Sequence, residues 1–397
     1  MLSPKSTETV RATLPAVGAA IGDVAPLFYR KLFAAHPELL RDLFNRGNQA
    51  TGEQQQALAG SIVAFATALL RHPDSTPEAL LSRIAHKHAS LGIAPAQYEI
   101  VYTHLFAALA EVLGDAVTDE VAEAWTEVYW LMADSLIAME SRLYAESGTT
   151  PETVLRDHIV VARRSETETV AVFTVRPSDG SAPAAARPGQ YVSVQVQLPD
   201  GARQIRQYSL VSAPGADGSL HFAVKCLADE PAGEVSTHLH DHVATGDVLR
   251  VSAPFGDSVL EEGDAPLLLA SAGIGCTPLT GMLSRLASTG TTRPVTVVHA
   301  DRSPATHAFR AELERYVDEL PHADAHIWYE VPGPDWPAER TGYADLAALD
   351  VPQGTTAYLC GPLPFMRRAR GQLLAAGVRA ADIHHEVFGP DLWRGEE

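Results

Sequence analysis

The spacing of hydrophobic residues changes twice along the chain, and these changes constrain the fold more than any other feature. Residues 1–147 have apolar residues at helical spacing and few helix breakers, as in EQQQALAGSIVAFATALLRH. From residue 152 the period is two, as in QYVSVQVQL, which is typical of half-buried strands. After residue 258 short apolar runs alternate with helical segments, which indicates a parallel sheet with crossover helices. We therefore expect an all-α domain, then an antiparallel β-barrel, then an α/β domain.

Composition excludes several kinds of partner and cofactor. A formal net charge of -19 argues against nucleic acid and anionic membrane surfaces as partners. No apolar run reaches the roughly 18 residues needed to span a bilayer, and the start lacks the apolar core of a secretory signal, so we expect a cytoplasmic protein. The three cysteines, Cys226, Cys276 and Cys360, include no close pair. Their spacing excludes a zinc ribbon, a CxxC redox motif and a four-cysteine iron–sulfur cluster.

The segment SRIAHKHASLG contains two histidines that face different directions on a helix. In the helix expected over residues 77–92, His88 follows Leu81 and Ile84 on the apolar stripe, whereas His86 lies off it. If either histidine faces an interior ligand, it is therefore His88. This helix alone leaves open a buried histidine that is satisfied by a backbone carbonyl.

Other polar side chains also fall on apolar helix faces in the first domain. Tyr29, Tyr98 and Glu140 are each in register with apolar residues. A carboxylate on such a stripe is unfavourable unless it is paired or hydrogen-bonded. The three residues therefore suggest a lined cavity, although each polar tip could instead reach solvent at a helix end.

The segments FNRGNQATGEQQQAL, IAHKH and PAQY, in this order, resemble the globin domain of the flavohaemoglobin family. The resemblance implies that His88 is the proximal ligand of a haem b iron and that Tyr98 and Glu140 form a hydrogen-bonded group behind it. A carboxylate behind the ligand makes the imidazole a stronger electron donor, which favours oxygen activation over storage. The resemblance also implies a distal side formed by Tyr29, Gln54 and Leu58, with Phe44 packed against the haem and Lys87 next to the ligand.

Two segments of the β domain resemble the flavin-binding signature of ferredoxin-reductase-like proteins. In IRQYSLVSAP, Arg206 would meet the FAD pyrophosphate, Tyr208 would pack on the flavin and Ser209 would bond its ring. PAGEVSTHLH opens a helix whose hydroxyls and free amides suit a phosphate, although alone it could be an ordinary capped helix. The predicted FAD-binding residues are Tyr191, Arg206, Gln207, Tyr208, Ser209, Gly233, Val235, Ser236 and Thr237.

The following HLHDH places His238, His240 and His242 in one helix. Ligands two residues apart diverge on a helix, so we expect a solvated histidine-rich face rather than a metal cluster. His86, His384 and His385 receive no role.

The third domain has a glycine-containing turn in PLLLASAGIGCTPLTGML, between a strand and a helix. It departs from G-x-G-x-x-G, because a proline replaces the last glycine, but its place after a flavin signature predicts pyridine nucleotide binding. In YLCGPLPFM the family cysteine, here Cys360, lies near the nicotinamide; it could equally be a small buried hydrophobe. In the C-terminal HHEVFGP the family phenylalanine covers the flavin, whereas the alternative is the end of an edge strand. The predicted residues are Gly273, Ile274, Gly275, Cys276, Thr277, Pro278, Cys360, Gly361, Val387, Phe388, Gly389 and Pro390.

The resemblance covers essentially the whole chain and implies a globin domain (1–147), an FAD-binding barrel (152–258) and an NAD(P)-binding domain (259–397). It implies a nitric oxide dioxygenase, an oxidoreductase that passes electrons from NADH or NADPH through FAD to haem and converts NO and O2 to nitrate. We expect these small molecules as its partners and no obligate protein partner. Asp301 and Arg302 leave the nucleotide open, because one suits a ribose hydroxyl and the other a 2′-phosphate. The alternatives are a haem-based O2 or NO sensor with an attached reductase, and a plain flavin reductase.

Overall fold

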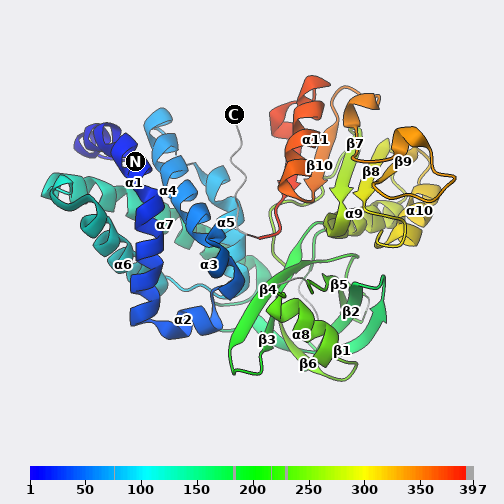
Figure 1. Cartoon of the computed structure of the whole chain (residues 1–397), viewed down its shortest axis with the longest axis horizontal. Coiled ribbons are helices and arrows are strands. Elements are labelled where there is room, and N and C mark those ends of the chain that lie inside the picture. Colours follow the sequence, from blue (N-terminus) through cyan, green and yellow to red (C-terminus); the bar gives the residue numbers. More distant parts are fainter. Residues whose placement is uncertain (76, 182–184, 216, 229–230, 390–397) are drawn as a thin grey trace. The chain divides into compact units, whose positions relative to one another are not determined.

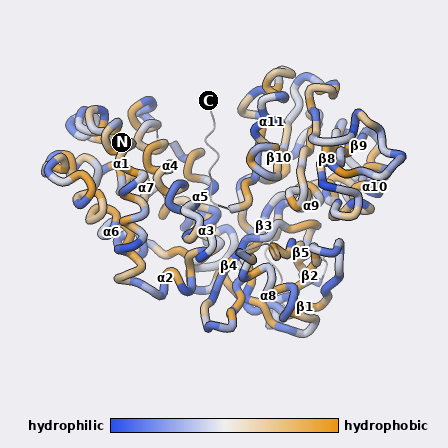
Figure 2. Tube along the Cα trace, in the orientation of Figure 1, coloured by the Kyte–Doolittle hydropathy of each residue, from blue (hydrophilic) through white to orange (hydrophobic). Residues whose placement is uncertain are grey.

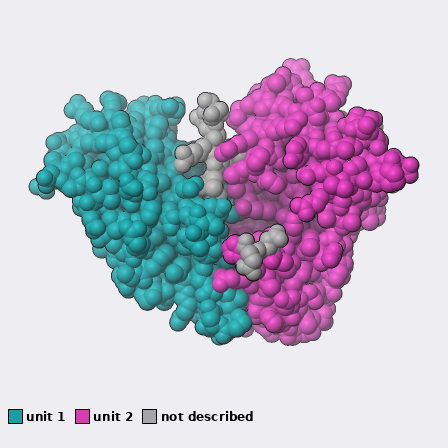
Figure 3. All heavy atoms as spheres, in the orientation of Figure 1, with its two compact units in different colours: residues 1–155, 197–206, 389–397 teal, residues 156–196, 207–388 magenta. Residues whose placement is uncertain are grey.

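The computed structural model describes residues 1–75, 77–181, 185–215, 217–228 and 231–389 (Figure 1). The chain divides into two compact units, coloured separately in Figure 3. Unit 1 contains Met1–Leu155, Gln197–Arg206 and Gly389; unit 2 contains Arg156–Val196 and Gln207–Phe388. The short segment Gln197–Arg206 therefore groups with the N-terminal helices.

The N-terminal part of the chain is helical, as predicted. Its helices are α1 Pro4–Ala35, α2 Pro37–Asp42, α3 Arg46–Thr51, α4 Glu53–Arg71, α5 Glu78–Leu91, α6 Ala96–Leu113, the 3-10 helix η1 Gly114–Ala116, and α7 Asp119–Ser147. α1 is long and apolar enough to cross a membrane by length and composition. However, its apolar side packs against α4, α6 and α7, and a core helix of a globular unit passes the same test.

The second part is a six-stranded antiparallel sheet with one helix. Its elements are β1 Leu155–Ser165, β2 Val170–Pro177, β3 Tyr191–Gln197, β4 Arg203–Ser209, β5 Leu220–Lys225, α8 Glu234–His242 and β6 Val248–Ser252. The strand order is β4-β3-β6-β1-β2-β5. A bridge from Leu210, just after β4, to Phe222 in β5 connects the two outer strands, as closure into a barrel requires.

The third part is a five-stranded parallel sheet in the order β11-β10-β7-β8-β9. Its elements are β7 Leu267–Ala272, η2 Gly273–Gly275, α9 Cys276–Thr289, β8 Val295–Asp301, α10 Arg310–Glu319, β9 Ala323–Tyr329, η3 Ala338–Arg340, η4 Leu346–Ala348, β10 Thr356–Cys360, α11 Leu363–Ala375, η5 Ala380–Asp382 and β11 Ile383–Glu386. Strands β7 and β8 are predominantly hydrophobic, as a sheet covered on both faces requires (Figure 2). The carboxyl ends of all five strands meet at one edge, where open α/β sheets bind ligands.

The fold class predicted from the sequence is thus confirmed. The predicted domain limits fall between α7 and β1 and between β6 and β7. The division into two compact units follows a different criterion, because Gln197–Arg206 joins the helices. The limits at 147, 152 and 258 therefore stay predictions.

Candidate active site

Three residues predicted to lie behind the haem form one hydrogen-bonded cluster in unit 1. His88 Nδ1 lies 2.9 Å from Glu140 Oε1 and 3.0 Å from the Tyr98 hydroxyl. The Tyr98 hydroxyl donates to the same Glu140 oxygen at 2.5 Å. Glu140 is 2% exposed and Tyr98 is 7% exposed, so neither polar tip reaches solvent at a helix end.

This cluster determines which nitrogen of His88 is available for a ligand. Burial, and next the negative charge of Glu140, raise the pKa of Tyr98, so its hydroxyl stays protonated and acts as a donor. The carboxylate accepts from Nδ1–H of His88, which fixes the tautomer with its lone pair on Nε2. Nε2 is the nitrogen that can bind iron, and the His88 side chain is 32% exposed, more than a core histidine on this stripe would be. The residues therefore fit the proximal side of a haem.

The end of α5 explains how His88 is positioned. Gly92 follows α5 in the left-handed conformation, with φ of 77°, and Ile93 N donates back to the His88 carbonyl at 3.1 Å. A Cβ atom on Gly92 would lie 2.6 Å from the Pro151 carbonyl oxygen. Because only glycine fits both constraints, it ends the helix one turn after His88.

Three of the predicted distal residues, Tyr29, Phe44 and Gln54, lie together in unit 1. Tyr29 on α1 is 5% exposed, and its ring centroid lies 5.8 Å from that of Phe44 in an edge arrangement. Burial raises the pKa of the Tyr29 hydroxyl, whereas the side-chain amides of Gln54 and Gln49 lower it by smaller amounts. The hydroxyl therefore stays protonated and has two amides beside it. Leu58 is a half-buried residue of α4 that packs against the helical core.

Gln49 was not predicted as a site residue. Its Nε2 atom is buried and has no hydrogen-bond partner among the described residues. A buried donor without a partner lowers the stability of the fold unless a ligand or water accepts from it. Gln49 lies in α3 and Gln54 in α4, with a left-handed Gly52 between them. The sequence signal was therefore weak, because the spacing of two glutamines across a helix break does not show that both reach Tyr29.

Lys87, next to the ligand position, is half-buried and its Nζ donates to the Gly389 carbonyl at 3.4 Å, within unit 1. Pro390, the last of the predicted site residues, lies outside the described residues. Val387 is half-buried after β11, and Phe388 is 49% exposed, which is unusual for a phenylalanine. An exposed aromatic is compatible with the predicted contact to a flavin.

The predicted flavin signature occupies the second half of β4. Strand alternation places Arg206 and Tyr208 on one face and Gln207 and Ser209 on the other. The Tyr208 ring stacks on Phe222, and Gln207 Nε2 donates to Ser193 Oγ at 3.0 Å.

Tyr191, the other predicted aromatic of the barrel, is buried at the start of β3. It exchanges two backbone hydrogen bonds with Phe255, at 2.8 and 2.9 Å. This pairing fixes the position of Tyr191 without using its side chain.

The start of α8 fits a phosphate in part. Ser236 Oγ donates to the Gly233 carbonyl at 3.0 Å and accepts from Leu227 N, so this hydroxyl already has partners within the chain. Thr237 Oγ1 is buried without a partner among the described residues, which leaves a hydroxyl for a ligand. Val235 is a core residue. Thr237 is therefore the better candidate for a phosphate contact.

The glycine turn after β7 lies at the carboxyl edge of the parallel sheet, where the predicted nucleotide residues meet. A Cβ atom on Gly275 would lie 2.4 Å from the Cys360 carbonyl oxygen, so this glycine is needed for packing against β10. By contrast, Gly273 has φ of 53° and nothing within 4 Å of its Cβ position, which leaves room for a ligand. Cys276, Thr277 and Pro278 open α9 and are buried, Ile274 is half-buried, and Gly361 follows β10 with φ of 155°.

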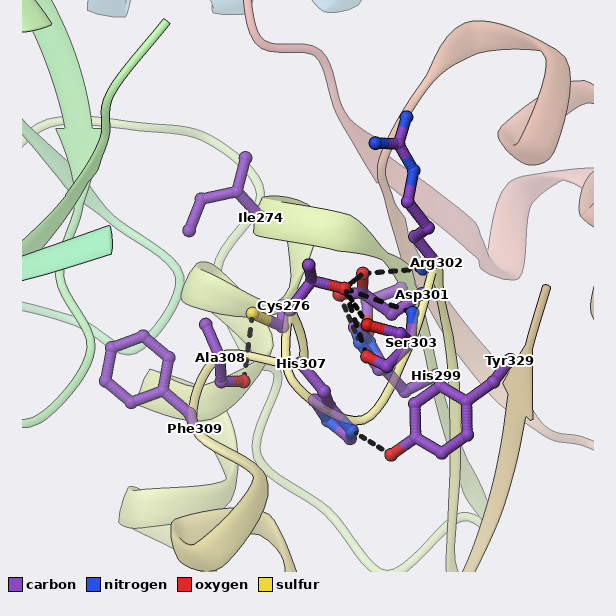
Figure 4. A network of polar contacts seen from close by, with 12 residues as sticks. Ile274, Cys276, His299, Asp301, Arg302, Ser303, His307, Ala308, Phe309 and Tyr329 are labelled. Carbon is purple, nitrogen blue, oxygen red and sulfur yellow. Dashed lines mark hydrogen bonds and ion pairs between the residues drawn. The ribbon is translucent and has the colours of Figure 1, made fainter. Parts of the chain in front are cut away.

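A polar network surrounds the end of β8 (Figure 4). Asp301 accepts from Thr306 Oγ1 at 2.6 Å and from Arg302 N at 2.7 Å. Burial alone would raise the pKa of Asp301, but the contact with His299 and the bonds from Thr306 and Arg302 together outweigh it and lower the pKa. His307 Nδ1 lies 2.8 Å from the Tyr329 hydroxyl. Because the Asp301 carboxylate already accepts hydrogen bonds from other residues of the chain, its presence alone does not indicate binding of the NADH ribose hydroxyl.

None of the three cysteines forms a disulfide; Cys276 and Cys360 are buried and Cys226 is half-buried. Burial, and next Asp301, raise the pKa of the Cys276 thiol, which makes it unreactive. In α8, His240 Nε2 bonds the Val224 carbonyl at 2.9 Å, whereas the rings of His238 and His242 lie 5.2 Å apart. Among the described residues, no group of three or more His, Cys, Asp or Glu side chains could hold a metal ion.

Comparison with known proteins identifies each part of the chain. Family models match a globin at residues 27–136, an oxidoreductase FAD-binding domain at 158–259 and an oxidoreductase NAD-binding domain at 269–371. The flavohemoproteins of Chromobacterium violaceum and Rhizobium meliloti are 41% and 40% identical, over 98% and 99% of this chain and 98% and 100% of theirs.

Two solved structures are similar as well. A crystal structure of a flavohemoglobin from Malassezia yamatoensis with bound FAD and heme has a TM-score of 0.90 and 38% identity, covering 98% of this chain and 100% of that one. The FAD/NAD-binding domain of a nitric oxide dioxygenase from Vibrio cholerae has a TM-score of 0.54 and 35% identity, covering 59% of this chain and 99% of that one.

The fold and the matches define an oxidoreductase in which a haem-binding globin is joined to a flavin- and pyridine nucleotide-dependent reductase. The chain belongs to the flavohemoprotein family. The cofactors expected from the sequence, haem and FAD together with a pyridine nucleotide, agree with this assignment.

Proposed function

We propose that this flavohemoprotein is an NAD(P)H-dependent nitric oxide dioxygenase that converts NO and O2 to nitrate in the cytoplasm. The observation that carries the proposal is the buried Glu140 bonded to Nδ1 of His88. A carboxylate behind the proximal imidazole increases electron donation to iron, which favours oxygen chemistry over simple binding. A sensor has less need of this arrangement.

The bound groups would supply two kinds of chemistry: haem binds a diatomic gas and accepts one electron, and FAD splits a hydride into single electrons. His88 would hold the haem through Nε2. Glu140 and Tyr98 keep the proton on Nδ1 and hold the ring in one orientation.

On the distal side, the Tyr29 hydroxyl is a hydrogen-bond donor. Because burial raises the pKa of its hydroxyl, it can donate a hydrogen bond to a substrate oxygen that gains negative charge during the reaction. The amides of Gln54 and Gln49 lie beside the hydroxyl and restrict its orientation. The buried Nε2 of Gln49 is a second donor that the same oxygen could use.

In the reductase part, Arg206, Ser209 and Thr237 would bind FAD, and the open side of Gly273 would accept the nucleotide. Electron counting then fixes the stoichiometry. Conversion of one NO and one O2 to nitrate takes one electron, and a hydride supplies two. Each NAD(P)H should therefore yield two nitrate ions.

The test measures NO consumption, NAD(P)H oxidation and nitrate in one aerobic reaction of the full-length protein loaded with haem and FAD. We expect two nitrate ions for each NADH or NADPH oxidised. The matched variant Tyr29→Phe keeps the ring and its packing against Phe44 but removes the hydroxyl. It should turn over about 100-fold to 1000-fold more slowly, since one lost donor costs about 2.7–4 kcal/mol.

Three results would contradict the proposal: NO consumption without NAD(P)H oxidation, turnover without nitrate, or an unchanged rate in Tyr29→Phe. Slow turnover with tightly retained gas would instead favour the sensor alternative.

A further inference from the structure

The buried side-chain amide of Gln204 connects β4, the strand with the predicted flavin signature, to the turn between α2 and α3. This turn contains Phe44, a predicted residue of the haem pocket. The Gln204 side chain in β4 is fully buried. Its Nε2 lies 3.3, 3.0 and 3.2 Å from the carbonyl oxygens of Leu40, Arg41 and Phe44. Residues Gln197–Arg206 and these helical residues belong to the same compact unit.

The other end of the amide is used as well. Gln204 Oε1 accepts from the backbone N–H of Arg46 and from Nη1 of Arg206, each at 3.3 Å. A glutamine amide offers two donor hydrogens and an oxygen with two lone pairs. Both the donor and the acceptor end of the Gln204 amide therefore have partners. Three carbonyl oxygens lie beside one end and two N–H donors beside the other, so the first end is the nitrogen and the second is the oxygen.

These contacts make Gln204 a cap for two helices at once. α2 ends at Asp42, so the carbonyls of Leu40 and Arg41 belong to its last turn, where helices leave carbonyls without internal partners. α3 begins at Arg46, whose N–H is a first-turn donor that also lacks an internal partner. The Gln204 side chain therefore bonds free carbonyl groups at the end of α2 and a free N–H group at the start of α3, and so holds the turn between the two helices in place.

That turn carries Phe44, which the family resemblance implies packs against the haem. The Phe44 ring lies 5.8 Å from Tyr29 and 5.3 Å from Phe33, both in edge arrangements. A shift of the turn would move Phe44 and, through it, the surroundings of the Tyr29 hydroxyl. On the other side, Gln204 restricts the guanidinium of Arg206, two residues along β4 in the predicted flavin signature.

We infer that Gln204 is a positioning residue for electron transfer, because it ties the Phe44 turn of the haem pocket to the flavin-binding strand β4. It touches neither substrate nor reacting atoms and acts through Phe44 and Arg206. The inference rests on the passage of electrons from flavin to haem and not on NO as substrate. It can therefore fail while NO dioxygenation stands, although it rests on the flavin-to-haem electron transfer of the proposed function.

The matched control is a neighbouring contact of the same segment. Arg203, beside Gln204, pairs with Asp42 at 2.7 Å, and its side chain is half exposed. The variant Arg203→Met removes this ion pair but leaves the Gln204 amide and its partners. Gln204→Met keeps the length of the side chain and removes all of its hydrogen bonds. A general weakening of the attachment would affect both variants, whereas loss of positioning would affect only Gln204→Met.

The experiment uses the full-length protein loaded with haem and FAD, mixed anaerobically with NADH in the presence of CO, which traps reduced haem. Stopped-flow absorption follows flavin reduction and haem reduction separately, and infrared spectra record the C–O stretch. In Gln204→Met we expect flavin reduction within about twofold of the unmodified protein and haem reduction slowed by about tenfold to a hundredfold, the range for a small misplacement. The C–O band should shift or broaden. Arg203→Met should change neither.

Haem reduction within about twofold of normal in Gln204→Met, or equal slowing in Arg203→Met, would overturn the inference. If Gln204→Met does not fold, Gln204→Glu provides the same comparison. It keeps an acceptor for Arg46 and Arg206 but turns an oxygen toward three carbonyls. Normal haem reduction with an unchanged C–O band in Gln204→Glu would also overturn the inference, and a slowed rate with normal flavin reduction would support it.

Discussion

Substitution of Glu140 by glutamine should raise the reduction potential of the haem. Glutamine matches the carboxylate in size and can still accept from His88 Nδ1–H, so the change removes the negative charge and little else. Ferric haem carries one more positive charge than ferrous haem and gains more from a carboxylate behind the ligand. The variant should therefore favour the ferrous state.

The magnitude follows from the contacts. A hydrogen bond to a charged group contributes about 1.5–3 kcal/mol and a neutral one about 0.5–1.5 kcal/mol, a difference of about 1–1.5 kcal/mol. Glu140 is 2% exposed, so solvent does not screen this difference. For a one-electron couple, about 59 mV corresponds to a tenfold change in equilibrium, so the shift should be about +45 to +65 mV.

The assay is a spectroelectrochemical titration followed at the Soret band. Tyr98→Phe is the control, because it removes the hydroxyl that shares Glu140 Oε1 and leaves the charge in place. Its potential should stay constant or fall. A change below about 10 mV in Glu140→Gln, or a shift in the negative direction, would refute the reasoning.

Three other features give predictions. Gly92→Ala should lower the free energy of unfolding by about 1–3 kcal/mol, because the position needs a positive φ. Gly18→Ala, with nothing near its Cβ position, should instead raise it by about 0.5–1 kcal/mol. Equal effects of the two substitutions in chemical denaturation would contradict this. Burial, and next His299, lower the pKa of His307 to about 2. The unfolded imidazole binds a proton below about pH 6.5, whereas the folded one stays neutral down to about pH 2. The free energy of unfolding should therefore decrease as the pH is lowered from about 6.5 towards 2, with a contribution from this group of up to about 1.4 kcal/mol per pH unit. His307→Gln should make the slope shallower by up to this amount, and an unchanged slope would contradict the assignment. Of the three thiols only Cys226 should react with a thiol reagent before unfolding, since the others are buried; rapid reaction of a second thiol would contradict this.

Much of the fold and part of the site could be predicted because their signals are local. The change from helical period to period two predicted the order of the three parts, and the apolar stripe of α5 separated His88 from His86. Glu140 on a buried stripe indicated a partner, because an unpaired buried carboxylate is unfavourable. The identity of that partner came from resemblance, since periodicity does not show which helix faces which.

Most of the features that sequence reasoning missed depend on contacts between distant segments. Gln204 and Phe44 are far apart in the chain, and neither a period nor a motif connects them. The two glycines of the turn after β7 look alike in sequence, yet Gly275 faces the Cys360 carbonyl and Gly273 faces open space. One missed feature is local: His238 and His242 are four residues apart in α8 and lie on one face, a spacing that the sequence already contains.

Haem binding through His88, in a chain that also carries the flavin, is the basis of the proposed function. The most direct measurement compares haem content, NO consumption and NADH-dependent reduction of ferricyanide in His88→Ala and in the unmodified protein. Loss of normally bound haem and of NO consumption, with ferricyanide reduction retained, is the predicted result. A variant that still binds haem normally and reduces it from NADH would contradict the account.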